Sequence, residues 1–111
     1  MNRMYAVIKR AEHFQEFVTG SRELRHLMNH FDGYCLGLEE VGKVKDGSFW
    51  YELKEYIAAK YDCDYTYDIA ALLLANHTSE AEAIVTFYKY FYEYAYTDDR
   101  YLFEEKQKKD G

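Results

Sequence analysis

Residues 24–38, LRHLMNHFDGYCLGL, decide the fold class of this chain. Their apolar residues recur every three or four positions, at Leu24, Leu27, Met28, Phe31, Cys35 and Leu38. This spacing predicts an amphipathic helix with one apolar stripe. Gly33 and Gly37 lie within the stretch, and each costs about 1 kcal/mol relative to Ala in a helix interior. We therefore expect a second helix to approach closely at these glycines, unless the helix already ends near Asp32 and Gly33.

The residues on the N-terminal side of this stretch predict short elements. Residues 1–9 mix apolar and polar side chains, and they fit either a short strand or the first turns of a helix. Residues 11–18 have the spacing of one short helix, which Gly20 ends. Ser21 is a suitable N-cap for the helix that follows.

The residues on the C-terminal side predict further helices. A polar loop is expected between Gly42 and Gly47, and Ser48 is expected to cap a helix that runs to Tyr61. A short buried helix is expected over residues 69–77, because its leucines and isoleucine have helical spacing.

The last segment fits two structures. Ser79 and Glu82 have the spacing of a capping box, which predicts the start of a helix. The tyrosines at every second position from Tyr88 to Tyr96 instead fit a strand. We favour the helix, because the capping box nucleates it and no turn interrupts the segment. On a helix these tyrosines divide between two faces, one expected in the core and one exposed as a contact surface.

The 111 residues are predicted to form one mainly all-α domain. We expect a compact bundle of four to five helices over residues 1–105, with a short N-terminal strand as an open alternative, and a disordered tail over 106–111. The longest apolar run has seven residues, whereas a membrane helix needs about 20. No secretory signal opens the chain. We therefore expect a cytoplasmic protein that contacts no membrane.

The charge of the chain is unevenly distributed. The formal net charge is −6, and residues 46–105 carry thirteen Asp or Glu against four Lys or Arg. A negative field repels phosphate backbones, so direct binding of nucleic acid is not expected. The same field attracts basic protein partners and speeds their encounter. An acidic surface kept for solubility is the simpler alternative.

Two clusters of residues are candidates for function. His26 and His30 share one helix face at a spacing that can bind zinc, but position 27 is Leu27 where zinc proteases carry their general base. With no third ligand indicated, we expect no metal site, no cofactor and no catalytic group.

The second cluster is an acidic segment interleaved with tyrosines. Together with a second acidic patch it forms the predicted partner-binding surface, which consists of Asp62, Asp64, Tyr65, Tyr67, Asp68, Glu39 and Glu40. Tyrosine gives a large contact area at low entropic cost, and carboxylates pair with basic side chains. Solvated loop acids are the alternative interpretation.

Three stretches of the chain carry a family resemblance. They are Phe17–Leu24 continuing to Phe31–Tyr34, then Phe49–Ile57 followed by Lys60-Tyr61, and last Ser79–Ala83 followed by the aromatic residues up to Tyr94. In this order they resemble small helical immunity proteins of bacterial toxin systems, including contact-dependent growth inhibition. The Arg-Pro pair that is usual near the start of those proteins is absent here, and Thr19 stands where Leu is usual.

The resemblance implies that this chain is not an enzyme but binds a cognate toxin and neutralises it by stoichiometric occlusion. The implied partner is a basic toxin domain, with a nuclease as the expected type, and the free protein is expected to be a monomer or a weak dimer. Two alternatives stay open. One is a homo-oligomeric regulatory or structural module that associates through its Tyr-rich last helix. The other is a metal-dependent hydrolase that uses His26 and His30.

Overall fold

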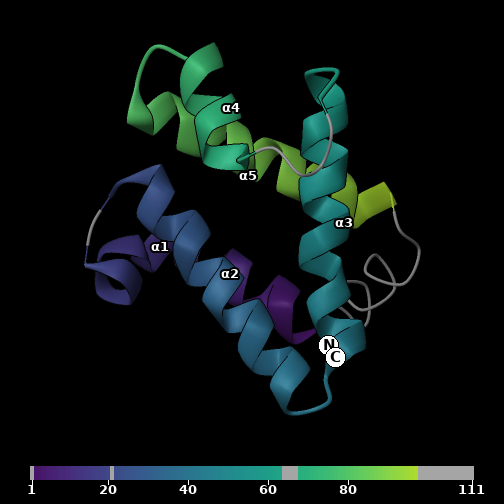
Figure 1. Cartoon of the computed structure of the whole chain (residues 1–111). Helices are drawn as coiled ribbons and strands as arrows, with labels where there is room; N and C mark the ends of the chain where they lie inside the picture. The colour runs from purple at the N-terminus through teal and green to yellow at the C-terminus, as the bar shows by residue number, and fades with distance from the viewer. Residues whose placement is uncertain (1, 21, 64–67, 98–111) are drawn as a thin grey trace, which may run out of the picture.

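The computed structural model describes residues 2–20, 22–63 and 68–97, and these residues form five α-helices and no strand (Figure 1). The helices are α1 (Arg3–Thr19), α2 (Leu24–Glu40), α3 (Val44–Lys60), α4 (Ile69–Asn76) and α5 (Glu80–Thr97). Figure 1 shows α2 and α3 diverging from one short turn, with α5 crossing behind α3. The all-α prediction is therefore confirmed for the described part of the chain.

The N-terminal segment is helical. Of the two structures considered for residues 1–9, the described residues 3–9 adopt the helix and not the strand, as the first part of α1. The backbone departs from helical geometry at Phe14, where φ is −128° and ψ is 28°. Tyr5 and Ile8 are buried and anchor the helix to the core.

α2 continues through both of its glycines. No atom outside the local backbone lies within 4 Å of the position that a Cβ would take at Gly33 or Gly37. The expected close approach at these two glycines is therefore wrong. Successive helical residues are rotated by about 100°, which places both glycines on the side of α2 opposite its buried stripe. The close contact is at Gly47 of α3, where a Cβ would lie 3.2 Å from Sγ of Cys35.

Gly42 ends α2 in a left-handed conformation, with a φ of 81°. Its amide donates to the carbonyl of Glu39 at 3.1 Å, and the amide of Lys43 donates to the carbonyl of Leu38 at 2.7 Å. These two bonds are those of a Schellman C-cap, in which glycine avoids the steric penalty of a Cβ.

α3 starts earlier than the sequence predicted. It begins at Val44, directly after the Schellman turn, so the predicted polar loop up to Gly47 is wrong. Ser48 is likewise not the N-cap of α3. It lies inside the helix, and its hydroxyl donates to the carbonyl of Lys45 at 2.7 Å.

The N-terminus of α2 is capped by a residue from another helix. Glu23 occupies the N-cap position, and its side chain makes no capping hydrogen bond. The amide of Leu24 instead donates to Oε2 of Glu80, at the start of α5, at 2.9 Å. The N-cap that we predicted at Ser21 lies outside the described residues.

The remaining two helices match their predictions more closely. α4 occupies the predicted range, and in α5 the amide of Glu82 donates to Oγ of Ser79 at 3.1 Å, as a capping box requires. The tyrosines of α5 do not divide into one buried and one exposed face as we expected. Tyr88 is buried and Tyr96 is exposed, and those between them are half-buried: Tyr90, Tyr92 and Tyr94.

One core joins the five helices, and aromatic rings dominate its centre. Phe31, Trp50 and Phe87 are fully buried. The ring centroids of Phe31 and Trp50 are 5.4 Å apart, and those of Trp50 and Phe87 are 6.2 Å apart. These edge-on contacts hold α2, α3 and α5 together, because aromatic pairs in this geometry add to the stabilisation from burial.

Candidate functional site

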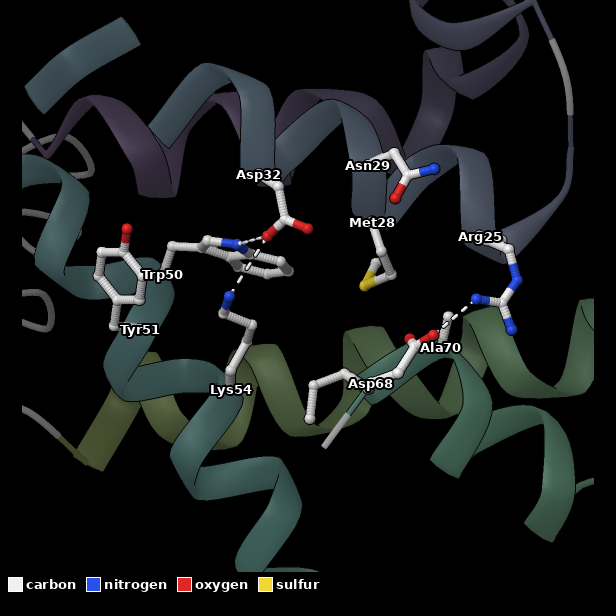
Figure 2. Close-up of a pocket in the computed structure, with 10 residues that line it drawn as sticks. Arg25, Met28, Asn29, Asp32, Trp50, Tyr51, Lys54, Asp68 and Ala70 are labelled. Carbon is white, nitrogen blue, oxygen red and sulfur yellow. Dashed lines mark hydrogen bonds and ion pairs between the residues drawn. The ribbon is translucent and has the colours of Figure 1, made fainter. Parts of the chain in front are cut away.

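A pocket of about 470 Å³ lies between α2, α3 and the start of α4 (Figure 2). Its lining residues are Arg25, Met28, Asn29, Asp32, Trp50, Tyr51, Lys54, Asp68, Ile69 and Ala70. On one side, Oδ1 of Asp32 accepts hydrogen bonds from Nε1 of Trp50 at 2.6 Å and from Nζ of Lys54 at 3.3 Å. Figure 2 shows the other oxygen of Asp32 turned away from both donors.

On the other side of the pocket, Arg25 pairs with Asp68. Nη1 of Arg25 lies 2.6 Å from Oδ2 of Asp68, while Oδ1 of Asp68 accepts the amide of Ala71 at 3.3 Å as the N-cap of α4. Burial alone would raise the pKa of Asp68, but the Arg25 guanidinium and the helix amides outweigh it and lower that pKa. Each acid of the pocket therefore has a cation of this chain beside it, and the pocket carries no excess of either charge.

The predicted acidic, Tyr-rich surface is only partly within the described residues. Asp64, Tyr65 and Tyr67 lie outside them. Asp62 is exposed in the turn after α3, with a φ of 54°. Asp68 is exposed, but its carboxylate already caps the first turn of α4 and forms an ion pair with Arg25. The carboxylate of Asp68 thus has a structural task, whatever else it contacts.

The predicted second patch lies at the other end of α3. Glu39 is half-buried and hydrogen-bonds the hydroxyl of Tyr51, which raises the pKa of that phenol. Glu40 is exposed. Asp62 follows Tyr51 by eleven residues, which corresponds to about 16 Å along a helix axis. The structure therefore does not bring Glu39 and Asp62 together.

The histidines that we considered as metal ligands contact other groups. Nδ1 of His26 lies 3.2 Å from Oε2 of Glu23, and the ring of His30 lies 5.9 Å from that of Phe31. Within residues 2–20, 22–63 and 68–97, no three His, Cys, Asp or Glu side chains are grouped so that they could hold a metal ion. No described third ligand therefore joins the two histidines.

A second candidate site lies where α3 packs against α5. Four half-buried tyrosines form it, and we call them the tyrosine seam: Tyr56 of α3, Tyr61 directly after that helix, and Tyr90 and Tyr94 of α5. The ring centroids of Tyr56 and Tyr94 are 5.4 Å apart, and those of Tyr61 and Tyr90 are 6.2 Å apart. The hydroxyl of Tyr94 also donates to Oε2 of Glu52. The seam is thus an aromatic strip with a carboxylate at one end.

Lys60 lies among the rings of the tyrosine seam. Its Nζ is 4.8 Å from the ring centroid of Tyr56 and 5.7 Å from that of Tyr90, which are cation–π distances. A hydrogen bond with Tyr56 raises the pKa of Lys60, and the charge of Glu93 acts in the same direction. Oε2 of Glu93 is buried and accepts no hydrogen bond from any described residue.

A hydrogen-bonded chain of three residues borders the seam. Nε2 of His77 lies 3.0 Å from the hydroxyl of Tyr61, and Nδ1 lies 3.3 Å from Oε1 of Glu82. The hydroxyl of Thr78 donates to Oε2 of Glu82 at 2.5 Å. Burial raises the pKa of Tyr61, and so does its hydrogen bond with Tyr90. A phenol held protonated in this way is a poor nucleophile, so the chain serves to join α3 to the turn before α5.

Sequence analysis did not select the tyrosine seam or the residues around His77. One usable signal was the spacing of Tyr56 with Lys60 and of Tyr90 with Tyr94, because residues four apart are neighbours on a helix. The meeting of the two pairs depends on how α3 crosses α5, and neither segment alone contains that information.

The chain matches no protein-family model, no curated protein and no solved structure. In the described part of the chain, none of the helices combines the length and the apolar character required to cross a membrane.

Proposed function

We propose that this chain is an immunity protein, which neutralises a cognate toxin by binding it stoichiometrically and occluding it. The toxin would be a basic domain, with a nuclease as the first candidate. The observation that carries the proposal is the tyrosine seam, because four half-buried tyrosines and the carboxylates of Glu52 and Glu93 share one surface. Aromatic residues are enriched in protein interfaces, and carboxylates select partners with basic side chains.

The charge distribution supports a basic partner. The net charge is −6, and thirteen of the twenty acids lie in residues 46–105, which include most of α3 and all of α5. A basic domain that evolved to hold phosphates would be attracted by this field, and its encounter with the chain would be accelerated. The same field opposes direct contact with a nucleic acid. An inhibitor also needs no catalytic group, since occupying the toxin surface is its whole action.

The resemblance to immunity proteins gives independent support. It covers the end of α1 with the first part of α2, the aromatic residues of α3, and α5 as far as Tyr94, and these helices contribute to the common core. Such a resemblance bears on fold more directly than on activity. We accordingly place the protein in the cytoplasm, where a bacterium would meet a toxin that has entered.

The test is capture followed by protection. The tagged chain is purified from its native host, and proteins bound in stoichiometric amount are identified by mass spectrometry. We expect a basic domain held at nanomolar affinity or tighter, which corresponds to about 12 kcal/mol of binding free energy. That domain is then expressed with and without this chain. Restored growth supports the proposal, and equal killing in both strains refutes it.

Charge reversal maps the contact on the captured partner. Changing Asp62 and Asp64 together to Lys is expected to weaken the complex by about 2–5 kcal/mol if these acids form buried pairs. The matched variant changes Glu39 and Glu40, at the C-terminus of α2, to Lys. Unchanged affinity of either double variant, measured by calorimetry, removes that patch from the interface.

Self-association is the second candidate function, and the outer face of α2 favours it. Leu36 and Val41 are 55% and 68% exposed. Gly33 and Gly37 leave open space beside Leu36, where another helix could approach. Sedimentation at increasing concentration tests this alternative. A dimer that Leu36→Glu dissociates would favour the module, whereas a monomer at all concentrations would exclude it.

A further inference from the structure

We propose that the tyrosine seam is a receptor site for one cationic side chain, a lysine or an arginine, of the protein partner. In the free protein Lys60 of this chain occupies the site, and the partner's side chain displaces it. The inference rests on the proposed function only in naming a protein as the source of the cation.

The first argument is the position of Lys60. Its ammonium group stands over two aromatic rings from different helices, Tyr56 at 4.8 Å and Tyr90 at 5.7 Å. Aromatic rings attract cations through the negative charge of their faces, and pairs of rings are a recurrent means of binding alkylammonium groups. The site therefore already performs the recognition that we assign to it, with an internal group as the ligand.

The second argument is that Glu93 has a carboxylate oxygen that lacks a described hydrogen-bond donor. Its Oε2 is buried, no described donor reaches it, and Glu93 follows Tyr90 by three residues, on the same side of α5. Lys60 senses the charge of Glu93 but gives no hydrogen bond to Oε2. A buried carboxylate oxygen without a donor is unfavourable, so a ligand that supplies one gains affinity. A guanidinium offers five donors in a fixed fork and is suited to reach the rings and the carboxylate together.

The third argument is that Lys60 is easily displaced. It is exposed, and its described contacts are with Tyr56 and with the ring of Tyr90. A lysine ammonium on a flexible stem exchanges readily with water. Lys54 in the pocket differs, because it is half-buried and lies 3.3 Å from Oδ1 of Asp32. The comparison selects the tyrosine seam over the pocket, in which both acids already have internal cations.

The test uses a peptide in place of the unknown partner. Acetyl-Gly-Arg-Gly-amide is titrated into the full-length protein, and tyrosine ring signals are followed by NMR. Lys60→Ala removes the internal occupant, so we expect it to bind the peptide about threefold more tightly than the natural protein does. Adding Glu93→Gln to Lys60→Ala is expected to weaken binding about tenfold, because a charge-assisted hydrogen bond is lost. The same peptide with citrulline in place of arginine should bind at least as weakly.

Two matched variants control the titration. Lys45→Ala removes an exposed lysine from the first turn of α3, and Glu55→Gln neutralises an exposed acid of the same helix. Neither is expected to change the affinity for the peptide. Circular dichroism verifies that each variant is folded. Equal affinity of Lys60→Ala and the natural protein, or shifts centred on the pocket, would overturn the inference.

The outcome is separable from that of the proposed function, since the peptide titration requires no toxin. If a captured toxin binds the natural protein and Glu93→Gln with equal affinity, the receptor site is refuted and the immunity function stands. If the peptide binds as expected but the chain protects cells against no toxin, the receptor site stands and the immunity function fails.

Discussion

On one side of α3, Asp32 and Lys54 form an ion pair in the pocket that α2 and α4 complete. On its other side, Lys60 lies over the rings of the tyrosine seam, and Oε2 of Glu93 is buried without a described donor. Both regions combine lysine, carboxylate and aromatic groups. They differ in one carboxylate oxygen, because Oε2 of Glu93 has no described donor, whereas Asp32 and Asp68 in the pocket each pair with a cation of this chain.

This difference shows that a count of acids does not identify those available to a partner. Asp68 belongs to the acidic segment that the sequence selected, yet it caps α4 and pairs with Arg25. The sequence patterns did not indicate Glu93, although its buried Oε2 lacks a described donor. A carboxylate with internal partners must lose them before it can bind another group, and that loss reduces the affinity it can provide.

The largest expected effect is on the free energy of unfolding, and substitutions on the two sides of α3 should change it by different amounts. Trp50→Ala should lower the free energy of unfolding by about 3–5 kcal/mol, because it leaves a cavity between fully buried rings. Tyr56→Ala on the seam should lower it by about 1 kcal/mol, since that side chain is only half-buried. Urea titration followed by circular dichroism measures both values. Equal losses in the free energy of unfolding would mean that the seam belongs to the hydrophobic core that stabilises the fold.

A smaller effect concerns the seam at alkaline pH. Tyr61→Phe should cost about 1 kcal/mol at neutral pH, because the hydrogen bond with His77 is lost. Burial raises the pKa of Tyr61, so its protonated form stabilises the fold below pH 10, and this share is lost as the pH rises further.

The natural protein should therefore lose more stability than Tyr61→Phe between pH 9 and pH 11. Urea midpoints at both values provide the measurement, and Tyr34→Phe, at a half-buried tyrosine outside the seam, provides the control. Identical decreases for the natural protein and Tyr61→Phe would contradict the expectation.

On the outer face of α2, which borders neither region, a substitution is expected to raise the stability of the fold. Gly33→Ala should raise stability by about 0.5–1 kcal/mol, because Ala restricts the unfolded chain and a Cβ meets open space. Gly47→Ala is the matched control, since its Cβ would lie 3.2 Å from Sγ of Cys35 and the gain should be cancelled. Thermal unfolding measures both. A loss of stability in Gly33→Ala would indicate that this face is covered by another molecule.

The smallest expected effect tests the pairing in the pocket. Asp68→Asn keeps an N-cap acceptor but removes the charge beside Arg25, and it should cost about 0.5 kcal/mol at pH 7. The pKa of Asp68 is lowered in the folded protein, so its charged form stabilises the fold above about pH 4, and this share is lost as the pH falls further. The difference between the two proteins should therefore shrink as the pH falls below about 4. Asp62→Asn, in the turn after α3, is the matched variant that removes one exposed carboxylate.

The helices themselves were largely predictable, because their signals are local. The apolar stripe of α2 recurs within each turn, and the capping box of α5 spans only four residues. Two of the errors occurred where a distant residue intervenes. Glu80 supplies the cap of α2 from 56 positions away. Gly47, and not Gly33 or Gly37, is the glycine that faces the neighbouring helix.

The candidate site likewise combines features that one segment determines with contacts that only helix packing determines. The sequence by itself determined the all-α class, most helix boundaries, the acidic character and the abundance of tyrosine, since each follows from composition or from periodicity along one segment. Only the tertiary structure decided that Asp68 is paired, that Lys60 lies over the rings of Tyr56 and Tyr90, and that Oε2 of Glu93 is buried without a described donor. The physical reason is that these contacts depend on the angle and rotation at which helices pack, which arise from the whole core and not from any one segment.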